Sequence, residues 1–217
     1  MPPHKEYIRA VYCAVVIHIS IGSPFSSCHN FACTGAQDAQ GEVHVVDSNN
    51  FCIGQGILCV QAAKHRDAGM AAADIAETLR TERAKVRAVY YLHALDFLSK
   101  SGRCPALVSM GATLLNLHPS ITVNSEKGEV VIGKKYRGKN APEAWLRDSA
   151  AKFLADCDPS LCFFMHTPDQ QPAQYEPMQA LAKELLPGID RLIMDDVGCT
   201  VIAHVGGNSF ALVGMMK

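Results

Sequence analysis

LDFLSKSGRC, residues 95–104, is the first of three stretches that decide the fold of this chain; GATLLNLHP follows at residues 111–119 and KKYRGK at residues 134–139. The apolar run at residues 87–91 leads into the first stretch and predicts a strand, because Val and Tyr favour a half-buried pleated surface. Ahead of the third stretch, two extended segments flank SEKG at residues 125–128 and predict an antiparallel hairpin. The three stretches therefore belong to one unit built from a strand, a helix and a hairpin.

Outward from this unit, apolar runs of strand length alternate with helical patterns. Strands are predicted at residues 11–19, 43–46, 87–91, 161–166 and 201–205. Helices are predicted at residues 53–66, 71–86, 107–115, 144–155 and 175–186, and the hairpin covers residues 121–136. Such alternation is typical of a sheet covered by helices. We predict an α/β fold with a mostly parallel sheet flanked by helices and an inserted antiparallel β-hairpin.

The composition describes a globular chain without a dominant charge. Of the 217 residues 48% are hydrophobic, enough for a sizeable core, and the formal net charge is -1. A chain with no global positive field is not drawn to nucleic acid or to anionic membranes. The apolar run at residues 11–17 is far shorter than the roughly 20 residues of a membrane span, and the turn residues after it argue against a signal peptide. We expect a cytoplasmic protein.

Nine cysteines raise the question of disulfides or a metal site. They contain no CxxC pair, and their odd number disfavours full pairing. Several of them, such as Cys13, Cys59 and Cys162, sit within apolar runs, where a reduced thiol behaves as a small hydrophobic group. We predict buried free thiols, and no metal.

A serine-rich turn, GSPFSSCHNFA at residues 22–32, lies where a strand ends and a helix begins. Hydroxyls and free backbone N–H groups at a helix N-terminus can hold an anion such as a carboxylate. The alternative is ordinary helix capping by Ser26 or Ser27.

Three further positions carry polar groups that can act in binding. Asp47, in VDSNNFCIGQG, follows a strand at the edge of the sheet where ligands often bind, or it caps the next helix; this segment lacks the nucleotide-binding glycine pattern. His204 lies near the end of the predicted strand at residues 201–205 and can donate a hydrogen bond to an anion, or it is a satisfied structural histidine. Arg103 and Arg137 each neighbour a glycine and can bind phosphate or carboxylate; the alternative is a tight turn and a solvated hairpin end.

The order and spacing of the three opening stretches resemble the DegV family. The resemblance implies that the chain binds one long-chain fatty acid in a buried tunnel, as a carrier without chemistry or cofactor of its own, similar to the acyl-carrier subunit of bacterial fatty acid kinase. By the family's SSxLSGTYxxA turn and its HxGxG segment, it implies Ser23, Ser26 and His204 as ligands of the lipid carboxylate. It also implies docking of a fatty acid kinase at Arg137, whereas Arg103 braces its turn.

The family pattern also implies a further N-terminal subdomain, with a DSxxD turn and a TSQPS loop, that this sequence lacks. We therefore expect residues 1–86 to form a truncated first α/β subdomain and residues 87–217 a second one with the hairpin, sharing the ligand tunnel between them. Four explanations stay open: a fragment, a misplaced start codon, a natural half with a partner, or a divergent variant. An incomplete tunnel would expose apolar surface, which predicts self-association or a complementing N-terminal chain.

Two other functions compete with the carrier. One is a hydrolase or acyltransferase that uses a serine of residues 22–27 with His204 as base, although the sequence has no GxSxG elbow. The other is a structural half-domain that binds no ligand.

Overall fold

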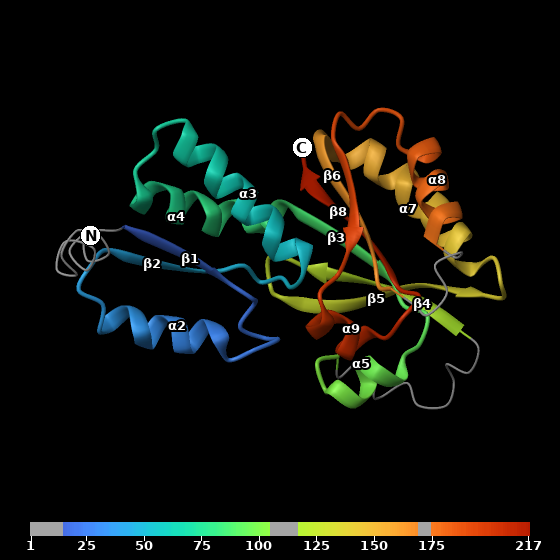
Figure 1. The fold of residues 1–217 in the computed structure, drawn as a ribbon, viewed down its shortest axis with the longest axis horizontal. Coiled ribbons are helices and arrows are strands. Elements are labelled where there is room, and N and C mark those ends of the chain that lie inside the picture. Colours follow the sequence, from blue (N-terminus) through green and yellow to red (C-terminus); the bar gives the residue numbers. More distant parts are fainter. Residues whose placement is uncertain (1–14, 105–116, 169–174) are drawn as a thin grey trace, which may run out of the picture.

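The computed structural model describes residues 15–104, 117–168 and 175–217. Within these residues the strands form two sheets (Figure 1). In the smaller sheet, β1 (Val16–Ser20) pairs in parallel with β2 (Val43–Asp47). The larger sheet has the order β5-β4-β3-β8-β6-β7. Its strands are β3 (Val86–Tyr91), β4 (Leu117–Asn124), β5 (Glu129–Arg137), β6 (Cys157–His166), β7 (Leu192–Asp196) and β8 (Phe210–Met216).

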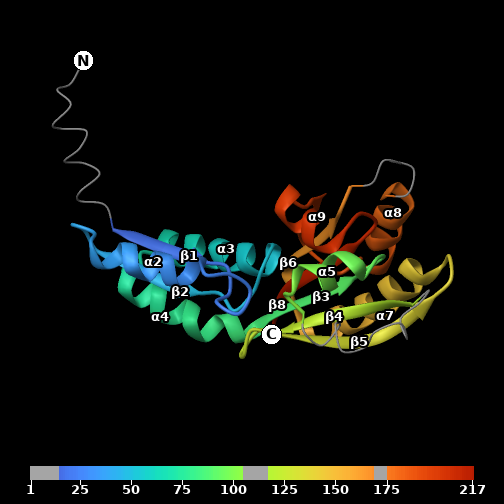
Figure 2. The ribbon, with the colours of Figure 1, turned by 90° about the horizontal axis from the view of Figure 1, so that it is seen from below.

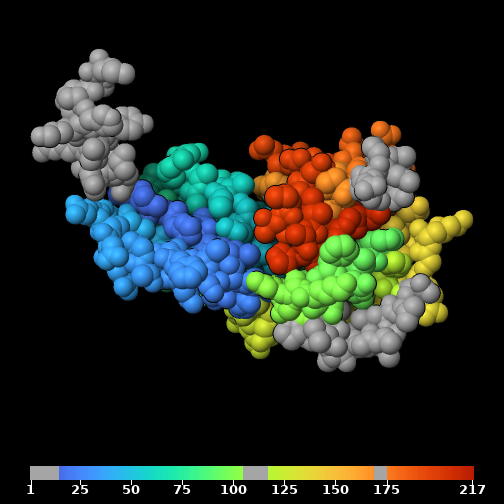
Figure 3. Space-filling model, turned by 60° about the horizontal axis from the view of Figure 1, so that its bottom comes forward, coloured from blue at the N-terminus to red at the C-terminus, as the bar shows by residue number. Residues whose placement is uncertain are grey.

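Helices cover both sides of the small sheet. The helix α2 (Cys28–Gln37) lies on one side, and α3 (Ile53–Asp67) and α4 (Ala72–Glu82) lie on the other (Figure 1). A short 3₁₀ turn, η1 (Arg83–Lys85), then leads directly into β3 of the larger sheet. Figure 3 shows these early segments, blue to teal, packed beside the rest of the chain, green to red.

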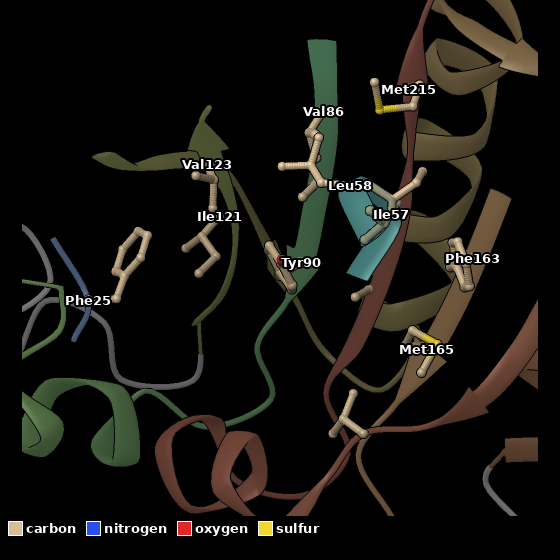
Figure 4. Close-up of a cluster of buried hydrophobic side chains, with 14 of the residues drawn as sticks. Phe25, Ile57, Leu58, Val86, Tyr90, Ile121, Val123, Phe163, Met165 and Met215 are labelled. Carbon is tan, nitrogen blue, oxygen red and sulfur yellow. The ribbon is translucent and has the colours of Figure 1, made fainter. Parts of the chain in front are cut away.

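The larger sheet separates two hydrophobic clusters. On one face lie α7 (Ala141–Asp156) and α8 (Tyr175–Leu185) (Figure 2). They cover a cluster that includes Trp145, Phe153 and Phe164. The opposite face packs against the early part of the chain, α5 (Asp96–Ser101) and α9 (Cys199–Val205). In this second cluster Phe25 and Ile57 come from the early segments, and Tyr90 comes from the larger sheet (Figure 4). One continuous core therefore joins the two sheets.

The α/β class and the inserted hairpin are confirmed. The parallel pairing that was expected to dominate is present in β1–β2 and β6–β7, but the larger sheet is mixed. The C-terminal strand β8 enters between β3 and β6 and runs antiparallel to both, and β4 is antiparallel to β3 and β5. The predicted strands at residues 43–46, 87–91 and 161–166 and the helices at residues 53–66, 144–155 and 175–186 are confirmed within a few residues.

The prediction of a strand at residues 201–205 is wrong, because this segment is the helix α9. Glycines stand at both of its ends, and Gly206 closes it with a positive φ of 76°, the usual left-handed helix stop. The strand that follows, β8, escaped prediction because it is buried on both faces and shows no alternation. The edge strand β7 also escaped prediction.

Two other predicted elements need qualification. The helix predicted at residues 71–86 ends early, since α4 stops at Glu82 and Val86 already belongs to β3. The helix predicted at residues 107–115 and the first part of the strand predicted at residues 11–19 lie outside the described residues.

The described cysteines are all free thiols, but their burial is mixed. Cys104, Cys157 and Cys162 are buried, whereas Cys28, Cys59 and Cys199 are exposed. The prediction of burial therefore holds for Cys162 and is wrong for Cys59, whose side chain faces outward from α3. Of the helices formed by the described residues, none has the length and the hydropathy needed to cross a bilayer.

The packing of the core predicts that two phenylalanines contribute very differently to the free energy of unfolding. Phe164 is 0% exposed and stacks on Phe210 at 5.8 Å, whereas Phe31 on α2 is 74% exposed. We expect Phe164→Ala to lower the free energy of unfolding by about 3–5 kcal/mol. Phe31→Ala, the matched control, should change it by less than about 0.5 kcal/mol. Urea denaturation of both variants checks this, and equal losses would contradict the assigned packing.

Candidate functional site

An apolar cavity of about 180 Å³ lies between the early part of the chain and the larger sheet. Its wall is formed mainly by hydrophobic side chains, including Ile21, Phe25, Phe51, Leu92, Leu98, Ile121, Val130, Val201 and Val205. A smaller cavity of about 20 Å³ shares Phe51, Tyr90 and Val205 with it. Both are below the roughly 300–1,000 Å³ of typical ligand pockets, so a long ligand requires the wall to open.

An aromatic stack forms one wall of the cavity. The ring of Phe25 meets Phe51 edge-on at 5.0 Å, and Phe51 stacks on Tyr90 with centroids 5.0 Å apart. Tyr90 is only 5% exposed, and its hydroxyl has no hydrogen-bond partner. Burial raises the pKa of this phenol well above its usual value, so the hydroxyl stays neutral. The wall therefore carries one buried and unsatisfied polar group.

Three polar side chains line the same cavity: Ser26, Arg103 and His204. Ser26 precedes α2, Arg103 follows α5, and His204 lies in the last turn of α9. The Nδ1 atom of His204 is buried without a hydrogen-bond partner. Arg103 Nη1 donates to the carbonyl of Ser101 at 2.6 Å, which braces the turn after α5. The fold thus brings together two of the predicted carboxylate ligands and one arginine.

The hydroxyl of Ser26 is also used locally. It accepts the backbone N–H of Cys28 at 3.3 Å and donates to Cys28 Sγ at 3.1 Å. Ser27, the N-cap residue of α2, makes no side-chain capping bond. Capping by Ser26 is therefore present, and it does not remove Ser26 from the cavity wall.

Ser23 and Arg137 lie away from the cavity wall. Ser23 is exposed, and its backbone N–H donates to the Asp47 carboxylate at 3.2 Å. Arg137 is exposed at the end of β5. Neither residue lines the cavity in the part of the chain that the structure describes.

Asp47 locks the serine turn against the loop after β2. Its carboxylate also accepts the N–H of Asn49 at 2.9 Å. Burial alone would raise the pKa of Asp47, but the hydrogen bonds from Ser23 and Asn49 outweigh it and leave the pKa lowered. Beside this contact, a Cβ on Gly22 would lie 2.9 Å from the backbone of Asn49 and Asn50. Asp47 is thus engaged in architecture, because its carboxylate joins the two loops.

Sequence reasoning missed two features of this region. Tyr90 was taken only as part of a strand, although it lines the cavity and its buried hydroxyl has no partner. His29, on α2, has Nδ1 2.9 Å from Ser20 Oγ and Nε2 3.5 Å from Cys33 Sγ, a network within the serine turn and its helix. The spacing of four residues between His29 and Cys33 on a predicted helix was the signal available for the second feature.

The fold and the cavity define an α/β protein with an apolar cavity that has polar groups on its wall. A family model described as "Uncharacterised protein, DegV family" matches residues 5–217. The chain belongs to the DegV family. A DegV domain-containing protein of Caldanaerobacter subterraneus is 29% identical over 193 residues, which cover 88% of this chain and 67% of that protein. One of Clostridium perfringens is 22% identical and covers 96% of this chain and 71% of that protein.

Solved structures show the same fold. A DegV family protein from Thermus thermophilus, described as fatty acid binding, superposes with a TM-score of 0.78 at 23% identity over 98% of this chain and 75% of that one. The fatty acid binding DegV family protein of Streptococcus agalactiae gives a TM-score of 0.79 at 17% identity, covering 99% and 77%. A DegV family protein from Eubacterium eligens, loaded with heptadecanoic acid, gives 0.78 at 18% identity, covering 98% and 77%.

Because the Tyr90 hydroxyl has no hydrogen-bond partner, we predict that removing it does not lower the stability of the fold. We expect Tyr90→Phe to raise the free energy of unfolding of the ligand-free protein by about 1 kcal/mol, because a buried group without a partner is destabilising. The matched control is Tyr136→Phe, which deletes a hydroxyl that donates to Asp148 at 3.0 Å and should lower stability by about 1 kcal/mol. Chemical denaturation measures both. Equal destabilisation would mean that the Tyr90 hydroxyl has a partner in solution.

Proposed function

We propose that this protein binds one long-chain fatty acid, with the acyl chain in the apolar cavity and the carboxylate beside Ser26 and His204. The observation that carries the proposal is the meeting of Ser26, Arg103 and His204 on the wall of one apolar cavity, together with the buried and unpartnered Nδ1 of His204. The fatty acid binding described for the structurally similar DegV protein of Thermus thermophilus and the heptadecanoic acid in that of Eubacterium eligens support it.

The physical basis of affinity would be burial of the acyl chain. Each CH₂ group removed from water contributes about 0.8 kcal/mol, so a long chain binds tightly with few polar contacts. The cavity holds about 180 Å³, and entry of the whole chain would therefore separate the early segments from the larger sheet. The aromatic stack of Phe25, Phe51 and Tyr90 lies where this separation has to occur.

The head group would set the orientation of the ligand. Protonated on both ring nitrogens, or on Nδ1 alone, His204 can donate from Nδ1 to a carboxylate oxygen. Arg103 adds a fixed positive charge at the same cavity, and the Ser26 hydroxyl can turn from Cys28 Sγ to the ligand. The proposal needs no metal or cofactor, because binding and orientation are its whole content.

Native mass spectrometry of the purified protein, followed by extraction and identification of the bound lipid, tests the proposal directly. A stoichiometric fatty acid supports it. A protein that remains empty and does not take up palmitate added at a molar excess would sink it and favour a structural half-domain without ligand.

Variants of the polar wall test the assignment of the head group. We expect His204→Ala and Ser26→Ala each to weaken palmitate binding about tenfold, because each removes a hydrogen bond to the charged carboxylate. Hexadecanol, which has the same chain without the carboxylate, should bind these variants and the parent protein about equally. Calorimetry with both ligands provides the measurement.

In the same titrations, Ser23→Ala tests whether Ser23 is a ligand of the carboxylate. The family pattern predicts Ser23 as a third carboxylate ligand, whereas its exposed position away from the cavity predicts no effect. A loss of palmitate affinity without a loss of hexadecanol affinity would place the Ser23 hydroxyl on the carboxylate.

Presentation of the bound carboxylate to a fatty acid kinase is the second part of the proposal. Arg137 is exposed and apart from the cavity, so it can contact a partner without touching the lipid. We expect Arg137→Ala to leave palmitate affinity unchanged and to abolish phosphorylation of the bound lipid by a fatty acid kinase, measured as acyl phosphate formed. Equal phosphorylation of variant and parent would exclude the docking role.

A serine hydrolase or acyltransferase is the competing function, and the shared cavity of Ser26 and His204 is the observation that favours it. Within the described residues, however, the Ser26 hydroxyl donates to Cys28 Sγ and forms no hydrogen bond with a histidine. An activated serine requires such a base within hydrogen-bond reach. Labelling by a fluorophosphonate probe would favour the enzyme, and its absence would favour the carrier.

A further inference from the structure

A second hollow lies on the opposite face of the larger sheet. This groove, of about 550 Å³, is bounded by α7 and by residues of β3, β4 and β5. Side chains along a strand alternate between faces, so Arg87 and Val89 line the groove while Tyr90 lines the apolar cavity. On β4, Thr122 likewise lines the groove, and Ile121 lines the apolar cavity. The groove is therefore separated from the proposed fatty acid site by the thickness of the sheet.

The groove carries a concentrated positive charge. Four cations line it, Arg87, Lys134, Arg147 and Lys152, against the single carboxylate of Asp148. Four positive charges and one negative charge leave a net charge of +3, although the whole chain has a net charge of -1. This charge is thus a local feature and not a share of a generally basic surface.

The one carboxylate in the groove is already occupied. Asp148 forms an ion pair with Lys134 and accepts a hydrogen bond from the Tyr136 hydroxyl at 3.0 Å. The hydrogen bond from Lys134 is the main cause of the lowered pKa of Asp148, so it is ionised and paired at neutral pH. Lys152 acts on Asp148 only through longer-range attraction. Asp148 therefore neutralises Lys134 and leaves the other three cations.

The side chains of Arg87, Arg147 and Lys152 form no ion pair with any residue that the structure describes. Arg147 and Lys152 lie on the exposed side of α7, where solvent alone can account for them. Arg87 differs because it sits on β3, between β4 and β8, among residues that are otherwise buried. A partly buried cation on an interior strand has lost part of its hydration, and a bound anion would compensate for that loss.

The floor of the groove is small and polar. Gly133 has no room for a side chain, because a Cβ there would lie 2.6 Å from Ser120 Oγ. Ser120 donates to the carbonyl of Lys134 at 3.1 Å, whereas the hydroxyls of Thr122 and Ser149 line the groove as further donors. The guanidinium groups of two arginines match phosphate oxygens in bidentate geometry. A volume of about 550 Å³ falls within the range of small-molecule sites.

We propose that this groove binds the phosphate chain of a polyphosphate or of a nucleoside triphosphate. Three uncompensated cations match the three to four negative charges of such a chain, and Arg87 at the base of the groove would contact the innermost phosphate. The same phosphate chemistry can come from inorganic triphosphate or from a nucleotide. The inference does not depend on fatty acid binding, because the two sites lie on opposite faces of the sheet.

Calorimetric titration of the full chain with sodium tripolyphosphate, and separately with ATP, tests the proposal. The titrations are made at roughly 50 mM salt, where screening is weak. We expect one ligand per chain. Arg147→Gln with Lys152→Gln should weaken binding about tenfold or more, and Arg87→Gln alone should do the same.

The matched control is Lys64→Gln with Lys183→Gln, which removes the same number of exposed positive charges on α3 and α8, outside the groove. Its affinity should equal that of the parent protein. Thermal unfolding monitors the folding of each variant. If Arg87→Gln fails to fold, the double variant on the exposed side of α7 still decides the question.

Equal affinities for tripolyphosphate and ATP would show that the groove reads the phosphate chain alone, and tighter binding of ATP would show that it also contacts the nucleoside. Both results support the site. No binding heat with either ligand overturns it. So does a loss in the Lys64 and Lys183 control equal to that in the groove variant, because binding would then follow diffuse surface charge. The same titrations are repeated with palmitate present. Because palmitate occupies a different site, failure of palmitate to bind and failure of the phosphate groove are then seen separately.

Discussion

The contact of Phe25, Phe51 and Tyr90 joins the two halves of this structure. The first two rings come from loops of the small sheet, and the third comes from β3 of the larger one. A two-stranded sheet is marginal alone, so β1 and β2 depend on burial against α3, α4 and the larger sheet. Because the rings also form the wall of the apolar cavity, the contact that holds the halves together is the one that a long ligand must rearrange.

The loops around this contact are held by backbone N–H groups that donate to one carboxylate. Asp47 accepts N–H groups from both loops, and Gly22 allows them to approach closely. This arrangement fixes the start of α2, and with it the position of Ser26 on the cavity wall. Ser23 lies at the Asp47 contact, outside the cavity. The serine turn thus divides into one residue for architecture and one for the site.

The period of two along β3 and β4 gives the larger sheet two different faces. One face is apolar and packs on the early part of the chain, and the other carries Arg87 and Thr122 towards α7. In a protein with a net charge of -1, this division collects unpaired cations in one groove. The α/β framework therefore supports two chemically distinct hollows without any contact between them.

The sequence by itself determined the α/β class, the hairpin, most of the helices and the family, because these depend on local periodicity, turn residues and motif spacing. It did not determine the order of the strands or the place of β8, whose uniform burial leaves no alternation to read. Nor did it show that residues 201–205 form a helix, since a short apolar run fits a strand equally well. Only the structure shows that Gly206 adopts a positive φ and ends a helix there. The meeting of Ser26, Arg103 and His204 was decided only by the tertiary structure, because three segments far apart in the chain must pack against one core before their polar groups share a cavity.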